Sequence, residues 1–195
     1  MSWLKQNRLF LSLPVDRLLA LTAYGEAASE GAEGMMAVIN VIINRLKNPR
    51  VFADKTILST TNNLWYAVIL KPYQFSVFNL NDRVRPKLKR LAKTFDSSIT
   101  VNPVLNQAYR LSKMGVSGFL ADNTKGATHY HTTAVSPPWS RTIERVGQIR
   151  RHIFYSAYPL WARIRKVGVS APSYTAYILL ALALTGIFIL SKKGR

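Results

Sequence analysis

The stretch 33–47 places the strongest constraint on the fold. It follows a helical period, and its apolar residues lie almost all round that helix, at Met35, Met36, Val38, Ile39, Ile42 and Leu46. A helix that is apolar on nearly every side has to be buried, so the other elements must pack around it. Asn48-Pro49 ends the pattern, because the residue before a proline disfavours helical geometry. We therefore expect one sizeable core built on a central helix.

The other segments predict a mainly helical fold with a small extended part. Further helices are predicted over 15–28, 63–69, 86–95 and 103–114. Residues 128–134 alternate β-branched and aromatic side chains, which is typical of a strand or an extended segment. Residues 142–154 form a basic stretch that we expect to be part helix. The expected fold class is α+β, mainly α.

A second apolar segment, 174–190, differs from the first in composition and place. Its seventeen residues carry no charge, Tyr174 and Tyr177 lie at one end, and basic residues flank both sides. At about 1.5 Å per residue it approaches the length that spans a hydrocarbon core. It predicts a transmembrane helix, with a buried core helix as the alternative. The expected organisation is a folded domain over 1–160, a basic linker over 161–173, the membrane helix over 174–190 and a basic tail over 191–195.

The charge of the chain predicts an anionic partner. Lys and Arg number 27 against 9 Asp and Glu, which gives a formal net charge of +18 at pH 7. Nucleic acid, anionic lipid and the carboxylates and phosphates of a bacterial envelope are the candidates. No nucleic-acid-binding signature accompanies the charge, so we expect an anionic envelope surface and no specific nucleic acid. The chain has no cysteine, which excludes disulfides, Cys-based zinc sites and thiol nucleophiles.

Three of the four glutamates lie within eight residues, at Glu26, Glu30 and Glu33. The helical pattern breaks among them, at Gly31. A carboxyl at such a junction can face a cleft and act as the proton donor of a glycosidase. It can equally be a solvated helix end, since the macrodipole favours acidic residues near a helix start. Glu33 fits the second interpretation because it opens the next helix, whereas composition leaves both open for Glu26.

Three ordered groups of residues decide between these interpretations. The first is the run 24–31, followed by Glu33-Gly34 and then 37–45; the second is Gln74-Phe75-Ser76 with Asn79; the third comprises 126–131, Pro138-Trp139 and 152–155. Together they resemble the motifs of the spore cortex-lytic, SleB-type cell wall hydrolases, over roughly residues 16–156. Ala28 and Gly31 depart from the family pattern, and the basic insertion 81–120 matches none of its motifs.

The resemblance implies a lysozyme-like catalytic domain related to the lytic transglycosylases, with Glu26 as the catalytic acid. Such an acid must keep its proton near neutral pH, which requires an apolar setting. Tyr24, Ala27 and Ala28 beside Glu26 suit that demand. For Glu30 three roles are open: a second acid, a hydrogen-bonding residue at the substrate, or a structural residue on the same helix face.

The later motifs imply the rest of the substrate site. Gln74 offers an amide to sugar hydroxyl and acetamido groups, Phe75 offers a ring for stacking, and Ser76 lies beside them. His129 and Tyr130 are expected near the substrate, with Tyr130 bonded to either the substrate or the acid. We expect His129 and His131 to face opposite ways. A His-x-His spacing alone does not define a metal site, so neither a metal nor another cofactor is expected.

The predicted function is cleavage of peptidoglycan glycan strands at the β-1,4 bond between N-acetylmuramic acid and N-acetylglucosamine, by a transglycosylase or muramidase reaction. The enzyme is expected to be membrane-anchored, with its catalytic domain facing the cell wall or periplasm. This architecture is typical of a phage-encoded lysis protein or a lytic component of the virion. The alternative is a non-enzymatic, membrane-anchored basic protein that binds the envelope or nucleic acid.

Overall fold

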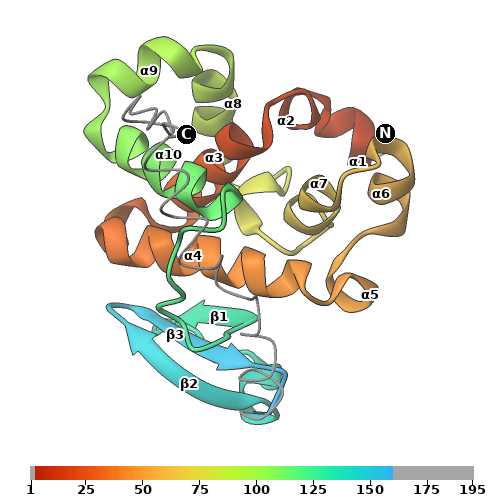
Figure 1. Ribbon diagram of the computed structural model, residues 1–195, viewed down its shortest axis with the longest axis vertical. Coiled ribbons are helices and arrows are strands. Elements are labelled where there is room, and N and C mark those ends of the chain that lie inside the picture. The colour runs from red at the N-terminus through yellow and green to blue at the C-terminus, as the bar shows by residue number, and fades with distance from the viewer. Residues whose placement is uncertain (1–2, 160–195) are drawn as a thin grey trace, which may run out of the picture. The chain divides into compact units, whose positions relative to one another are not determined.

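Helix α4 (Gly31–Leu46) is the central element of the computed structural model, which describes residues 3–159 (Figure 1). The side chains of Met35, Val38, Ile39 and Ile42 on this helix are 0% exposed. Burial of one aliphatic side chain of this size stabilises a fold by about 1.5–3 kcal/mol, so α4 contributes a large part of the core. The buried central helix predicted over 33–47 is confirmed.

The remaining helices surround α4 and α3 (Val15–Ala27), which packs against it. One group consists of α8 (Arg85–Lys93), α9 (Phe95–Val101) and α10 (Pro103–Val116). A second group, on the other side of α3 in Figure 1, consists of α1 (Trp3–Gln6), α2 (Arg8–Leu11), α5 (Pro49–Phe52), α6 (Lys55–Thr61) and α7 (Leu64–Ile69). Helix α10 approaches α4 closely at Gly115, where a Cβ would lie only 2.9 Å from Ile39 Cγ2.

Side-chain caps explain where two of these helices begin. The Asp54 carboxylate accepts a hydrogen bond from Ile57 N–H at 2.9 Å and starts α6. Asn102 Oδ1 accepts one from Leu105 N–H at 3.0 Å and starts α10. Such a cap stabilises a helix by about 1 kcal/mol. Pro103 follows at the first position of α10, where its missing N–H has no intrahelical partner to lose.

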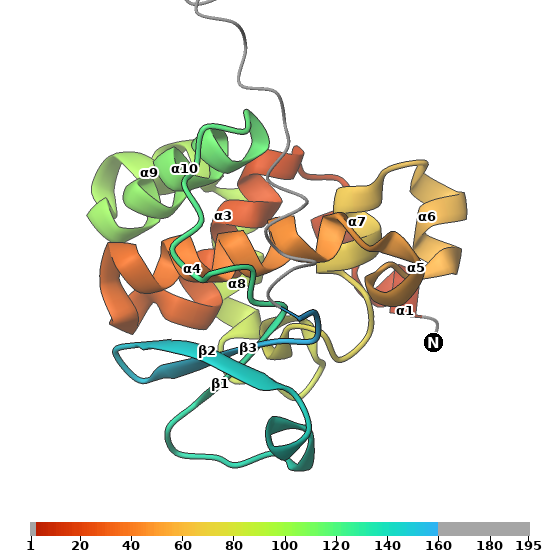
Figure 2. The same cartoon turned by 60° about the horizontal axis from the view of Figure 1, so that its bottom comes forward.

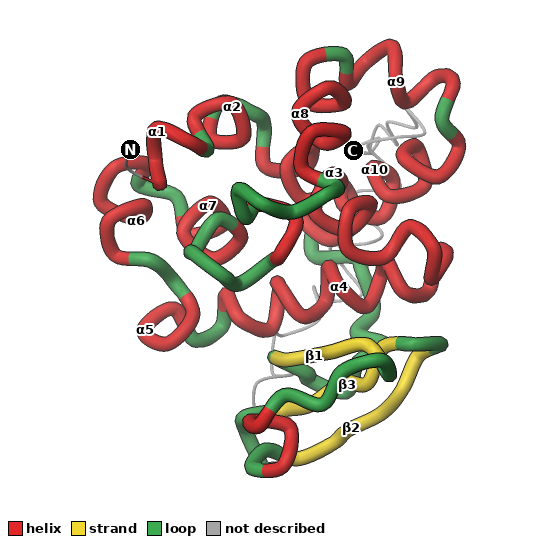
Figure 3. The backbone as a smooth tube through the Cα atoms, turned by 180° about the vertical axis from the view of Figure 1, so that it is seen from behind, coloured by secondary structure: helices red, strands yellow, loops and turns green. Residues whose placement is uncertain are grey.

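Three short antiparallel strands lie on one side of α4 and form the extended part of the fold (Figures 2 and 3). They are β1 (His129–Thr132), β2 (Glu144–Ile149) and β3 (His152–Ser156), in the order β1-β3-β2. Phe154 of β3 packs against Ala37 and Val41 of α4 in a second, smaller apolar cluster. The mainly helical α+β class is therefore confirmed, and so is a strand within 128–134.

The basic stretch 142–154 forms β2 and most of β3, so the prediction that it is part helix is wrong. Its pattern has a period of two: His152 and Phe154 are buried, whereas Ile153 between them is less so. Arg150 and Arg151 join the two strands as a two-residue turn. Arg150 has a φ of 50°, the left-handed geometry that tight hairpin turns use. Many polar residues in the stretch conceal this alternation.

The described residues up to Tyr158 form one compact unit. The predicted basic linker, membrane helix and basic tail lie outside the described residues. Across 3–159, none of the helices combines the length and the apolar character that crossing a membrane requires.

Candidate active site

Glu26 lies in the last turn of α3, which ends at Ala27. Gly25 beside it allows a distant segment to come close. A Cβ at Gly25 would lie 2.9 Å from Val77 Cγ1 and 3.0 Å from Leu88 Cδ1, so a larger residue would displace one of them. The small residue therefore lets the backbone of the 3₁₀ helix η2 (Ser76–Phe78) reach the Glu26 carboxyl.

Two segments far from Glu26 in the sequence hold its carboxyl. The Tyr130 hydroxyl donates a hydrogen bond to Oε2 at 2.8 Å, and Val77 N–H donates one to Oε1 at 3.3 Å. Ser76 Oγ lies 3.5 Å from Oε1, at the limit of hydrogen-bonding distance. The Glu26 side chain is half-buried. Its carboxyl is thus fixed in orientation while the residue keeps contact with solvent.

The setting of Glu26 favours its protonated form. Burial has the largest effect on the pKa of Glu26 and raises it, and the negative charge of Asp82 raises it further. The hydrogen bonds from Tyr130 and Val77 act in the opposite direction without cancelling this effect. The C-terminal end of a helix also disfavours a nearby negative charge. Because its pKa lies above the ordinary value, Glu26 can act as a general acid at higher pH than an exposed glutamate.

Tyr130 of β1 connects the sheet to the Glu26 carboxyl. Burial raises the pKa of Tyr130 well above its ordinary value, and the charge of Glu26 adds to this, so the hydroxyl stays protonated and acts as a donor. The ring centroid of Tyr130 lies 5.0 Å from that of His152 and 5.8 Å from that of Phe154. Of the two partners expected for Tyr130, the substrate and Glu26, the structure shows a hydrogen bond to the Glu26 carboxyl.

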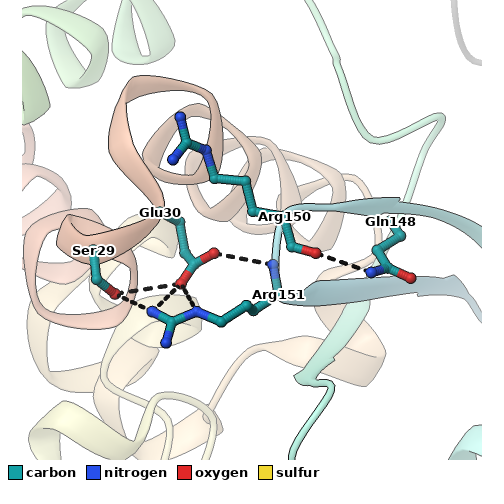
Figure 4. A network of polar contacts seen from close by, with 5 residues as sticks. All are labelled: Ser29, Glu30, Gln148, Arg150 and Arg151. Atoms are coloured by element: carbon teal, nitrogen blue, oxygen red, sulfur yellow. Dashed lines mark hydrogen bonds and ion pairs between the residues drawn. The ribbon is translucent and has the colours of Figure 1, made fainter.

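Glu30 ends the 3₁₀ helix η1 (Ala28–Glu30) and is engaged by Arg151 at the tip of the β2–β3 hairpin (Figure 4). The side chain is only 4% exposed; Oε2 accepts a hydrogen bond from Arg151 N–H at 3.1 Å, and Oε1 lies 2.6 Å from Arg151 Nη2. Burial raises the pKa of Glu30, but the hydrogen bonds and charge of Arg151 outweigh it and bring the pKa below the ordinary value. Of the three roles expected for Glu30, the structural one fits this geometry.

The second motif lies beside Glu26, but Phe75 does not have the expected role. Its side chain is 2% exposed, and its ring faces the Arg45 guanidinium with 5.1 Å between the Arg45 Cζ and the ring centroid. The prediction that this ring offers a stacking surface to a sugar is therefore wrong. Gln74 is half-buried next to it, and Ser76 is exposed next to the acid. Their contact with substrate stays a prediction.

His129 and His131 contact the same aromatic ring. Trp139, in the 3₁₀ helix η3 (Pro138–Arg141), has its ring centroid 5.3 Å from that of His129 and 5.6 Å from that of His131. Residues two apart on a strand share a face, so the prediction that they point opposite ways is wrong. Burial lowers the pKa of His129 to about 4, with a further contribution from the charge of Arg45. The His129 ring is therefore neutral at neutral pH.

Hydrogen bonds occupy these histidines. His129 Nδ1 lies 2.9 Å from Thr128 Oγ1, and His131 Nε2 lies 3.0 Å from the Tyr155 hydroxyl. No three His, Asp or Glu side chains among residues 3–159 are grouped so that they could hold a metal ion.

Three groups that act on the site were not predicted to have a role there. The N–H of Val77 is a backbone donor and leaves no signal in a side-chain pattern. Asp82 acts on Glu26 through its charge, and an acidic residue within a basic insertion is a signal that sequence analysis can use. Arg45 interacts with Glu26 and Tyr130 through its charge. Its signal is a basic residue in a helix that is otherwise apolar nearly all round.

Comparisons with known proteins agree with the motifs. The family model described as Cell Wall Hydrolase matches residues 29–155, a span that begins just after Glu26. Among solved structures, the catalytic domain of SleB from Bacillus cereus aligns with a TM-score of 0.46 and 20% identity, covering 73% of this chain and 89% of that domain. The catalytic domain of the germination-specific lytic transglycosylase SleB from Bacillus anthracis aligns with a TM-score of 0.49 and 22% identity, covering 73% and 93%. No curated protein sequence matches significantly. Because the family match spans well over half of the chain, the protein belongs to the cell wall hydrolase family and is a peptidoglycan-degrading enzyme.

Proposed function

We propose that the enzyme cuts peptidoglycan glycan strands at the β-1,4 bond between N-acetylmuramic acid and N-acetylglucosamine, with Glu26 as the general acid. The observation that carries this proposal is the setting of the Glu26 carboxyl, which is half-buried, has a raised pKa and is oriented by Tyr130 and Val77. A glycosidic bond breaks when an acid protonates the leaving oxygen while positive charge develops on the sugar ring. Membership of an enzyme family argues against the alternative of a non-enzymatic envelope- or nucleic-acid-binding protein.

In the proposed reaction Glu26 gives its proton to the glycosidic oxygen as the bond from that oxygen to the anomeric carbon breaks. The leaving sugar departs with a free hydroxyl group. The Glu26 carboxylate is stabilised by the Tyr130 hydroxyl and Val77 N–H, which already donate to its two oxygens. It then takes the proton of the nucleophile that bonds to the anomeric carbon, which restores the acid. One residue thus acts first as acid and then as base.

Two nucleophiles complete this cycle, and their products differ by one water. Attack by water gives a reducing end, which is the muramidase reaction. Attack by the 6-hydroxyl of the muramic acid gives a 1,6-anhydro ring, which is the transglycosylase reaction. In an inverting hydrolase a second carboxylate takes the proton of the water in place of Glu26, whereas the internal attack needs no second carboxylate. Asp82, whose charge acts on Glu26, is the residue with which to test this difference.

The experiment compares the wild-type enzyme, Glu26→Gln and Asp82→Asn on purified peptidoglycan, with mass spectrometry of the released muropeptides. We expect Glu26→Gln to release no glycan fragments. Anhydro products that persist in Asp82→Asn would assign the transglycosylase reaction, and reducing ends that vanish in this variant would assign hydrolysis with Asp82 as the base. Peptide fragments without any cut in the glycan strand would overturn the proposal.

We also propose that residues 174–190 anchor the enzyme in a membrane, with the catalytic unit facing the cell wall. Support comes from the seventeen uncharged residues of the segment, the tyrosines at one end and the basic residues on both sides. The test compares the whole chain with a chain lacking 173–195 in a membrane flotation assay. Loss of membrane association without loss of activity on purified wall is the expected result. A lytic role in phage infection, in lysis or in the virion, is a narrower proposal that rests on the same architecture.

A further inference from the structure

Arg45 is a buried cation between the two segments that hold the acid. The residue is 5% exposed, and its guanidinium lies over the rings of Phe52 and Phe75, with its carbon 5.5 Å and 5.1 Å from their centroids. Its Nε–H donates a hydrogen bond to the Thr128 carbonyl at 2.7 Å. Phe75 directly precedes η2, and Thr128 stands two residues before Tyr130. Arg45 therefore contacts one residue close in sequence to Val77 and one close to Tyr130, the two residues that donate to the Glu26 carboxyl.

One nitrogen of the Arg45 guanidinium lacks a hydrogen-bond partner among the described residues. Its Nη1 is buried and forms no hydrogen bond with any residue of the described part of the chain. An unpaired buried donor lowers stability, so its presence in a folded protein needs an explanation. Arg85 provides the contrast. It is 3% exposed and lies over Phe10 at 5.5 Å, but its Nη1 and Nη2 donate to Asn7 Oδ1 at 2.9 Å and to the Gln6 carbonyl at 2.8 Å.

The charge of Arg45 interacts with the site. Burial lowers the pKa of Arg45 to about 10, while the charges of Tyr130 and Glu26 act to raise it, so Arg45 is a cation at neutral pH. The same charge helps to lower the pKa of His129. Three charged or titratable groups therefore act on Glu26 or are acted on by it: Tyr130 from β1, Arg45 from α4, and Asp82 from the segment before α8.

We infer that Arg45 is a positioning residue for the catalytic acid, an inference that rests on the proposed role of Glu26. Its fixed charge stabilises the carboxylate that Glu26 becomes when its proton moves to the glycosidic oxygen. The Arg45 charge is buried, so it is screened less than a surface charge, and it needs no reorganisation during the reaction. Its bond to Thr128 also holds β1 so that Tyr130 stays within reach of Glu26. Arg45 thus makes Glu26 a stronger acid than burial alone would, and so lowers the pH at which Glu26 loses its proton.

The test is the pH–rate profile of Arg45→Met on purified peptidoglycan. We expect a rate near the pH optimum that is lower by roughly 10- to 100-fold, because the carboxylate is less well stabilised. We also expect the alkaline limb to move to higher pH by roughly half to one unit, the size expected for loss of one charge from a partly screened site. The direction follows because Glu26 without a neighbouring cation keeps its proton to higher pH. Arg45→Lys restores the charge and should return the limb to its wild-type position.

Two further variants separate this role from packing. Arg45→Gln is neutral but keeps a donor for the Thr128 carbonyl, and it should show the same shift of the limb. Arg85→Met removes a buried arginine of matched exposure; it should lower the melting temperature and leave the limb in place. An unshifted limb in the folded neutral variants of Arg45, or failure of both to fold, would reduce Arg45 to a structural residue and overturn the inference. An active Glu26→Gln enzyme would instead overturn the proposed acid itself, so the two failures are distinguishable.

Discussion

Glu26 and Glu30 belong to the same acidic run, yet the fold places their carboxyls in opposite settings. Glu26 accepts hydrogen bonds from two neutral donors, the Tyr130 hydroxyl and the Val77 N–H, and its pKa is raised. Glu30 is bound to a cation, Arg151, and its pKa is lowered. Burial acts on both in the same direction. The charge of the partner therefore separates the carboxyl with the raised pKa from the carboxyl with the lowered pKa.

The backbone between the two residues explains why they diverge. In a continuous helix, residues four apart share a face. Here α3 ends at Ala27, η1 follows, and Gly31 has a φ of 69° before α4 continues. This break directs Glu30 to the hairpin instead of the acid. Gly34 provides room for it, because a Cβ at that position would lie 2.2 Å from the Glu30 Cβ.

Among variants of the acidic run, Glu26→Gln should have the largest effect on turnover. An amide cannot donate the proton, so turnover of purified peptidoglycan should fall by about 100- to 10,000-fold. Because this carboxyl forms no ion pair with any other residue in 3–159, the melting temperature should stay close to that of the wild type. Clearing of a peptidoglycan suspension measures the first effect and thermal unfolding the second. Near-normal turnover would show that another residue is the acid.

Glu30→Gln should act on stability instead. Loss of the charge-assisted hydrogen bonds to Arg151 should lower the free energy of unfolding by about 2–3 kcal/mol. Its pKa is lowered on folding, so its contribution is complete above the ordinary carboxyl pKa and is lost as the pH falls through the lowered value. Denaturant titrations of wild type and variant should therefore converge in acid. A folded but inactive Glu30→Gln enzyme, together with an active Glu26→Gln enzyme, would show that the two roles are exchanged.

Tyr130→Phe tests the neutral-donor side of the comparison. The variant loses the hydrogen bond to Oε2, so the Glu26 carboxylate is less stabilised and the pKa of Glu26 rises further. We expect turnover to fall by about tenfold, which corresponds to about 1.4 kcal/mol, and the alkaline limb of the pH–rate profile to move upward. Tyr155→Phe is a suitable control, because the Tyr155 hydroxyl bonds to His131. A downward shift of the limb in Tyr130→Phe would contradict this account.

Glu33→Gln should have the smallest effect. Glu33 is exposed in the first turn of α4, where the helix dipole favours its negative charge. The expected loss of stability is about 0.3–1 kcal/mol, reduced by salt, with unchanged turnover. Thermal unfolding at low and high ionic strength measures it. A marked loss of activity would show that Glu33 also takes part in catalysis.

Much of the helical framework could be predicted from the sequence, because α3, α4, α7, α8 and α10 carry a clear period or turn signals. Helices α5, α6 and α9 contain two or three apolar positions each, too few for a period to emerge, whereas all six residues of α7 are apolar or aromatic. Strands β2 and β3 were missed because polar residues conceal their alternation. The motif predicts Glu26 as the acid, and that role stays a prediction. For Tyr130 the sequence left the substrate and Glu26 open as partners, because the bond joins residues 104 apart in the sequence. Val77 was not predicted, since it contributes only its backbone.

The tether between Glu30 and Arg151 also bears on how activity is lost on heating. The sheet carries Tyr130, and it is attached to the helices through the small apolar cluster around Phe154, this ion pair and the Arg45–Thr128 hydrogen bond. Proteins open in cooperative parts, and a small sheet with few apolar contacts opens at lower free energy than a packed helical core. Release of the sheet alone would remove a donor from the acid while the helices stay folded. Inactivation should therefore precede the loss of helical circular dichroism, and the interval should widen in Glu30→Gln.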